Sequence, residues 1–86
     1  MGQRFFFHVH NGSGDLRDEE GAELRNVDAA RDFAITAVRS LLREEVGEGR
    51  LDLRGYIEVV DATGQVVLIL PYSQAVEVIM DSPSPG

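Results

Sequence analysis

The sequence has no cysteine and no lysine, and each absence excludes a class of chemistry. Without cysteine there is no disulfide, no thiolate metal ligand and no cysteine nucleophile. Without lysine there is no amine for Schiff-base catalysis. A chain of 86 residues without disulfides fits a reducing compartment better than a secreted setting. We therefore expect a cytoplasmic protein.

Long apolar runs are also missing. The run Phe5-Phe6-Phe7 is followed by His8 and His10, so it stops well short of the apolar region of a signal peptide. No segment approaches the roughly 18 apolar residues that a membrane span needs. We expect neither a targeting signal nor a membrane partner.

Positive charge is scarce. Lys and Arg together number 8 against 15 acids, which gives a net charge of −7, and no base occurs in residues 55–86. Nucleic-acid affinity depends largely on cations that neutralise phosphates. The charge balance therefore predicts no nucleic-acid binding, and it favours a basic protein as the kind of protein partner.

The N-terminal region predicts two strands. Aromatic and β-branched residues over 4–10 favour a pleated surface, and residues 11–15 have the composition of a turn. Residues 18–24 are acidic and contain Gly21, which is typical of an edge strand. The side chains expected to point inward are Phe5, Phe7, Val9, Ala22 and Leu24.

A helix is predicted to follow Asn26, a good N-cap residue, with Asp28 in its first turn. Gly47 or Gly49 is expected to end it through the left-handed backbone conformation. Helical spacing predicts one buried stripe with Phe33 at its margin. The stripe comprises Val27, Ala30, Ala34, Ala37, Val38 and Leu41.

Residues 55–61 and 65–70 predict a second hairpin, which Pro71 ends. Residues 73–79 fit either a helical turn or a further short strand. The order β-β-α-β-β predicts an α+β fold, with one helix packed on one face of a four-stranded, mostly antiparallel sheet. Residues 1–80 are expected to form a single domain and residues 81–86 a flexible C-terminal tail.

His8 and His10 are the candidate metal ligands. Alternate strand residues share a face, so both imidazoles can approach one ion, with a third ligand from Asp15, Asp18 or Glu20. The competing interpretation is a solvated pair on a strand surface. No third ligand has a diagnostic spacing, so we expect no metal and no cofactor, and keep His8, His10 and Asp18 as candidates.

Other motifs lack the features that chemistry requires. The acidic segment 15–21 does not follow the EF-hand pattern, and Gly12-Ser13-Gly14 lacks the Gly-Lys-Ser/Thr end of a phosphate loop. No hydroxyl has a base at a recognisable spacing. We expect no catalytic residue.

The face opposite the expected helix is not cleanly polar, and the helix also carries apolar residues away from its stripe. A patch of this kind is unusual for a monomer and is typical of an interface. The alternative is that residues 72–80 fold back and cover this face within one chain. The predicted homodimer interface comprises Phe6, Ile35, Leu42, Val46, Val67 and Ile69.

Several segments together resemble an uncharacterised family of small bacterial proteins over residues 4–79. They are Arg4-Phe5-Phe6-Phe7-His8, Asp18-Glu19-Glu20-Gly21-Ala22-Glu23-Leu24, Arg50-Leu51-Asp52-Leu53, Ile57-Glu58-Val59 and Pro71-Tyr72. The resemblance implies a bacterial, cytoplasmic protein and brings no catalytic residue and no ligand.

Glu20-Gly21 ahead of Ala30, Ala34 and Ala37 is similar, more distantly, to the N-terminal domain of HicB-type antitoxins. The Pro-rich segment and the DNA-binding domain of those antitoxins are missing from this sequence. The similarity implies toxin neutralisation only by analogy of arrangement.

The sequence thus leaves the function unknown and supports three hypotheses. The leading one is a small non-enzymatic, cytoplasmic interaction module that self-associates. The second is a small metal-dependent or hydrolytic enzyme that uses His8, His10 and nearby acids, and the third is an antitoxin-like protein. An enzyme needs a concave site that joins these groups, whereas a module needs an exposed apolar face.

Overall fold

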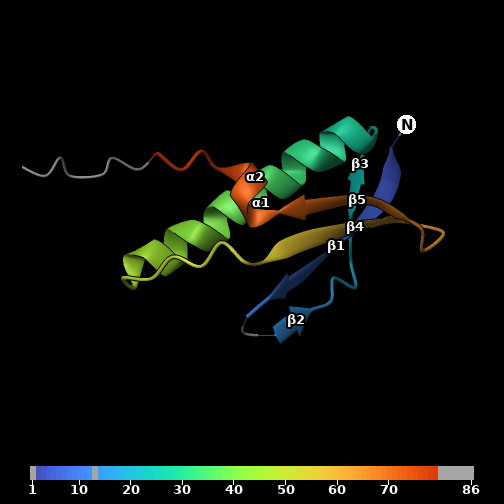
Figure 1. Ribbon diagram of the computed structural model, residues 1–86. Coiled ribbons are helices and arrows are strands. Elements are labelled where there is room, and N and C mark those ends of the chain that lie inside the picture. The colour runs from blue at the N-terminus through green and yellow to red at the C-terminus, as the bar shows by residue number, and fades with distance from the viewer. Residues whose placement is uncertain (1, 13, 80–86) are drawn as a thin grey trace, which may run out of the picture.

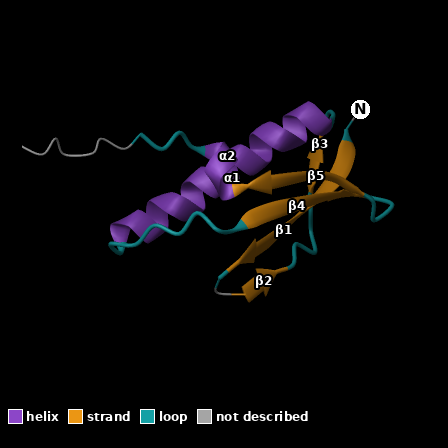
Figure 2. Cartoon of the chain, viewed as in Figure 1, coloured by secondary structure: helices purple, strands orange, loops and turns teal. Residues whose placement is uncertain are grey.

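The computed structural model describes residues 2–12 and 14–79 (Figure 1). One long helix crosses one face of an antiparallel sheet, which confirms the predicted α+β class and element order (Figure 2). The predicted tail, residues 81–86, lies outside the described residues. The elements are β1 (Gln3–Asn11), β2 (Gly14–Leu16), β3 (Ala22–Leu24), α1 (Val27–Gly47), β4 (Tyr56–Asp61), β5 (Val66–Pro71) and α2 (Tyr72–Ala75).

The sheet has the order β2-β1-β4-β5, and β3 also pairs with β1. Every pair is antiparallel. β2 pairs with the second half of β1 and β3 with the first half, so two short strands share one edge. The single return strand expected at residues 18–24 is therefore wrong. Residues 17–21 form a loop there, and Gly21 adopts φ +72°, outside the extended region.

The core lies between the sheet and α1. Phe5, Phe7, Ile57, Val59 and Leu70 supply the sheet side of this core, and all five are buried. From the helix, Ala30, Ala34, Val38 and Leu42 are buried. The two fully buried alanines allow α1 to approach the sheet closely.

The predicted helical stripe needs two corrections. The buried row has a spacing of four residues, so Leu42 lies in the core and Leu41 is only partly buried. Val27 is 41% exposed, because it is the first residue of α1. Phe33 lies at the margin as expected, with its ring 4.7 Å from that of Phe7.

Both ends of α1 use local signals that the sequence contains. Asn26 Oδ1 accepts a hydrogen bond from the Ala29 N–H at 2.9 Å, which confirms the predicted N-cap. The helix ends at Gly47, and Gly49 adopts φ +80° while its N–H donates to Val46 O. The left-handed glycine is thus two residues beyond the helix.

Residues 73–79 are not a strand. The short helix α2 follows β5, and Val76 to Ile79 have no regular structure. α2 packs against α1, where Arg39 Nε donates to Ala75 O at 2.8 Å and both Tyr72 and Ala75 are buried. The alternative in which residues 72–80 cover the opposite sheet face is therefore wrong for the described residues 72–79.

Among the helices of the described residues, none has the length and apolar character needed to cross a membrane.

Candidate functional site

The candidate site is the sheet face that lies opposite α1, which we call the open face. Residues paired across antiparallel strands point to the same side of the sheet, so the register defines three rows on this face. In the described residues both helices pack on the other side (Figure 2). The rows are Phe6–Val60–Val66, His8–Glu58–Ile69 and His10–Tyr56–Pro71.

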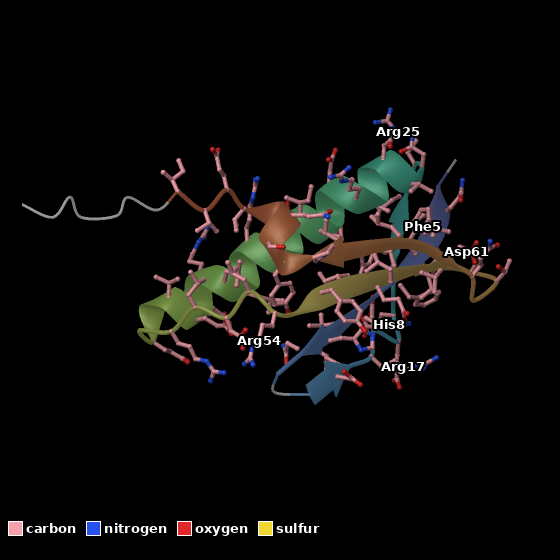
Figure 3. The ribbon with its side chains drawn as sticks, in the orientation of Figure 1. Phe5, His8, Arg17, Arg25, Arg54 and Asp61 are labelled. Carbon is pink, nitrogen blue, oxygen red and sulfur yellow. The ribbon has the colours of Figure 1, made fainter. Side chains whose placement is uncertain are left out.

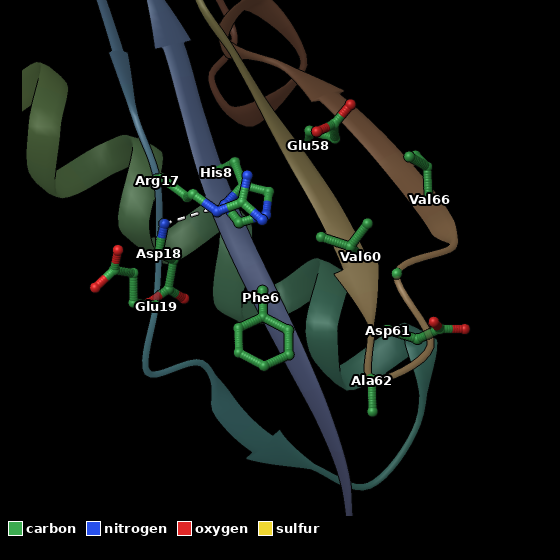
Figure 4. Close-up of a pocket in the computed structure, with 11 residues that line it drawn as sticks. Phe6, His8, Arg17, Asp18, Glu19, Glu58, Val60, Asp61, Ala62 and Val66 are labelled. Atoms are coloured by element: carbon green, nitrogen blue, oxygen red, sulfur yellow. Dashed lines mark hydrogen bonds between the residues drawn. The ribbon is translucent and has the colours of Figure 1, made fainter.

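A hollow of about 500 Å³ lies on the open face beside the loop of residues 17–21. Figure 4 shows its walls: Phe6 and His8 come from β1, Glu58 and Val60 from β4, and Val66 from β5. Phe6, Val60 and Val66 make the apolar part. Arg17, Asp18, Glu19, Glu58 and Asp61 add charged groups to the lining.

Asp18 holds the loop onto β1. Its Oδ2 accepts from the Phe7 N–H at 3.1 Å, and its Oδ1 accepts from the N–H groups of Glu20 and Gly21 at 3.2 and 3.1 Å. The Asp18 N–H donates in turn to His8 Nδ1 at 3.0 Å, the dashed line in Figure 4. On this edge of β1, β2 pairs with residues 9–11 and β3 with residues 3–5, so among the described residues no strand pairs with residues 6–8 here. The Asp18 bonds take the place of a strand partner in this gap.

The charge state of Asp18 follows from these contacts. Partial burial acts to raise the pKa of Asp18, but the backbone N–H groups of Gly21, Phe7 and Glu20, with His8 nearby, outweigh it. The pKa of Asp18 is therefore below its usual 3.8. The carboxylate is ionised near neutral pH and acts as a hydrogen-bond acceptor for the loop.

His10 lies between two carboxylates. Its Nδ1 is 2.9 Å from Asp15 Oδ1 on β2, and its Nε2 is 3.7 Å from Glu58 Oε1 on β4. The ring stacks on Tyr56 with a centroid distance of 4.8 Å. Nε2 is buried and has no hydrogen-bond partner among the described residues.

The candidate metal ligands do not converge. His8 Nδ1 and the Asp18 carboxylate are engaged by backbone N–H groups, while Asp15 pairs with His10 instead. Within residues 2–12 and 14–79, no group of three or more His, Asp or Glu side chains is placed to hold a metal ion. The hollow also has no hydroxyl or thiol among its lining residues that an acid–base pair could activate.

The predicted interface residues separate into three places. Phe6 and Ile69 lie on the open face, and Ile69 is 45% exposed. Ile35 and Val67 are partly buried against the core. Leu42 is only 5% exposed, so it belongs to the core and not, as predicted, to a free surface. Val46 is exposed at the far end of α1, where it lines an apolar groove of about 460 Å³.

Sequence reasoning missed Glu58 and Tyr56 as neighbours of His10, and it assigned no role to Tyr72. Tyr56 and Glu58 alternate along β4 in the same way as His8 and His10 alternate along β1. Only the register between the two strands shows which of these residues lie opposite each other. Tyr72 is buried beneath α1, and its sequence context gives no signal for this.

The model of a family described as "Domain of unknown function (DUF6894)" matches residues 4–73. This match confirms the predicted likeness to an uncharacterised family. No curated protein matches the chain, and no solved structure matches it. The likeness to HicB-type antitoxins receives no support from these comparisons.

Proposed function

The chain belongs to the DUF6894 family, whose description assigns no function, and from its geometry we propose a small non-enzymatic interaction module that forms a homodimer through β5. The observation that carries the proposal is an uncharged edge strand, β5, with exposed apolar side chains beside a sheet face that no described helix covers. The partner is a second copy of the chain, which pairs its own β5 antiparallel to the first.

β5 presents unpaired backbone groups at the sheet edge. It is the last strand in the order β2-β1-β4-β5 of the described residues. Tyr72 N donates to Gly55 O, and the register continues through Ile57↔Leu70 and Glu58↔Ile69. Since hydrogen-bonded and non-hydrogen-bonded pairs alternate, the N–H and C=O of Ile69 point away from β4.

Charge favours this edge for contact between two copies. Each copy carries a net charge of −7, so like-charge repulsion opposes most surfaces. The segment Val66–Pro71 has no charged residue. Val66 and Ile69 are 46% and 45% exposed and extend the apolar side chains of the open face to this edge.

The opposite edge is unsuited to strand pairing. β2 and β3 have three residues each, and the loop held by Asp18 separates them. Glu19, Glu20 and Glu23 add negative charge along it. Short, interrupted and charged edges are a common protection against strand addition.

The free energy of association expected for such a dimer is modest. Burying the exposed halves of Val66 and Ile69 from both copies contributes about 4 kcal/mol, since full burial of such a side chain is worth about 1.5–3 kcal/mol. Backbone hydrogen bonds across the edge add to this, and association costs oppose it. We therefore expect a dissociable dimer. We place this dimer in the bacterial cytoplasm, and the absence of cysteine from the sequence fits a reducing compartment of this kind.

The test is sedimentation velocity over a concentration series from low to high micromolar. The wild type is expected to shift from monomer to dimer, and Ile69→Glu to remain monomeric with an unchanged circular dichroism spectrum. Val46→Glu is the matched control, since Val46 is also exposed but lies on the groove at the far end of α1. It should dimerise as the wild type does.

Two results contradict the proposal. A wild-type monomer at high micromolar concentration removes self-association altogether. A dimer that Val46→Glu breaks and Ile69→Glu leaves intact places the interface at the groove instead of β5.

A further inference from the structure

A small cavity lies between the C-terminal part of α1 and the end of β1, on the side away from the open face. Its volume is about 150 Å³. Asn11, Leu41, Glu44, Glu45, Glu48 and Tyr72 line it.

Tyr72 is one of the residues that line this cavity. The residue is 2% exposed, and its hydroxyl oxygen is buried with no hydrogen-bond partner in the described part of the chain. A Cβ atom at Gly55 would lie 2.6 Å from Tyr72 Cε2 and 2.8 Å from Cζ, so the ring occupies the space that this glycine leaves. The Tyr72 N–H also donates to Gly55 O at 2.9 Å. The ring is therefore held in place, although buried tyrosine hydroxyls usually have a partner.

The three glutamates lack positive charge beside them. Glu44 and Glu48 are one turn apart, so their like charges repel. They lie at the C-terminal end of α1, where the helix dipole disfavours acids, and the last turn has no base. None of the three forms an ion pair with an arginine in residues 2–12 or 14–79.

The arginines of the connector between α1 and β4, residues 48–55, do not pair with these glutamates. Arg54 Nε and Nη2 donate to Asp52 at 3.0 and 2.9 Å, and Arg50 Nη2 lies 3.8 Å from the same carboxylate. Figure 3 shows Arg54 beside this connector. Within the cavity, Glu45 Oε2 accepts only a long bond, 3.4 Å, from the Asp52 N–H.

We infer that this cavity binds a guanidinium group. A guanidinium ion is planar and carries several N–H donors in a fixed arrangement. It can therefore donate to the glutamate carboxylates and to the Tyr72 hydroxyl oxygen together. The small volume selects the end group of a side chain or a small free cation. The site is independent of dimer formation through β5.

The experiment is a ¹H–¹⁵N chemical-shift titration of the full chain with methylguanidinium chloride. Tetramethylammonium chloride at the same ionic strength is the control, because it has the charge without N–H donors. We expect saturable chemical-shift changes around Glu44, Glu48 and Tyr72 with methylguanidinium and none with tetramethylammonium. Nα-acetyl-arginine amide is titrated separately. Tighter binding of this compound identifies a partner's arginine side chain as the source, and tighter binding of methylguanidinium identifies a free small cation.

Three variants test the geometry. Tyr72→Phe is expected to weaken methylguanidinium binding roughly tenfold, because it removes a hydrogen bond in a charged network. Glu48→Gln should weaken it several-fold. Glu19→Gln, an exposed acid on the hollow of the open face, should leave it unchanged. Ile69→Glu should also bind normally, which separates this site from the proposed dimer.

Absence of saturable binding overturns the inference. So does equal binding of tetramethylammonium, which indicates general charge attraction. If Tyr72→Phe binds as tightly as the wild type, the hydroxyl has no part in the site and the inference is also wrong.

Discussion

The backbone N–H of Asp18 donates a hydrogen bond to Nδ1 of His8 at 3.0 Å, and the carboxylate of Asp18 accepts from the N–H of Phe7, the residue before His8. Together these bonds hold the loop of residues 17–21 against β1. The same arrangement uses two of the three candidate metal ligands for structural purposes. It also forms one wall of the hollow on the open face.

Asp18→Ala is expected to destabilise the protein by about 2 kcal/mol, because three backbone N–H groups lose a charged acceptor at a partly exposed site. Asp18→Asn should cost less, about 1 kcal/mol, since its amide retains one oxygen but turns a donor toward one of the N–H groups. Urea unfolding of both variants measures the difference. Equal stability of Asp18→Ala and wild type would show that the loop bonds contribute nothing.

Asp18 also makes the stability of the fold depend on pH. The folded pKa of Asp18 is lowered below 3.8, so its contribution is present above the unfolded pKa and is lost as pH falls through the folded pKa. The stability difference between wild type and Asp18→Ala should be constant above about pH 5 and should shrink below about pH 4. A difference that grows on acidification contradicts this sign.

Gly21→Ala should destabilise the fold by about 2–4 kcal/mol. Gly21 has φ +72°, and an added Cβ would lie 2.7 Å from Phe5 O and 3.0 Å from the Phe6 ring. Gly64→Ala is the matched control, with φ +87° but nothing within 4 Å of its Cβ, and it should cost about 1 kcal/mol of backbone strain. Thermal and urea unfolding compare the two. Equal losses would mean that the contact at Gly21 relaxes freely.

Ile69→Pro tests the edge pairing through the backbone alone. The Ile69 N–H points away from β4, so its loss should leave the monomer folded but prevent β5 from pairing with a second copy. Leu70→Pro removes a bond to β4 and alters a fully buried core position, so it should unfold the chain. Circular dichroism and light scattering follow both. A folded Ile69→Pro dimer would show that β5 is not the interface.

Zinc in modest excess should change the melting temperature very little, because His8 Nδ1 and Asp18 are already engaged. A ligand at 100 times its dissociation constant adds about 2.7 kcal/mol, which corresponds to a rise on the order of 10 °C in a domain of this size. Such a rise, abolished by His8→Gln, would support a metal site and revive the enzyme hypothesis. Differential scanning calorimetry with and without zinc measures it.

The candidate site was only partly predictable. The alternation of side chains along residues 6–10 places Phe6, His8 and His10 on the sheet face away from the core, and the structure agrees. The pairing of His10 with Asp15 and Glu58 depends on the registers of two different ladders, which side-chain alternation does not determine. The buried hydroxyl of Tyr72 depends on the packing of α2 against α1, which no local signal indicates.

The sequence by itself determined where α1 begins and where the turn between β4 and β5 lies. Asn26 reaches the N–H of Ala29, and Asp61 accepts from the N–H groups of Thr63 and Gln65, so these caps and turns close within a few residues. Only the tertiary structure decided that β2 and β3 divide one edge of the sheet and that, among the described residues, no strand pairs with the outer edge of β5. The physical reason is distance along the chain: a cap is satisfied by its own neighbours, whereas a strand edge or a cavity depends on which remote segments pack beside it.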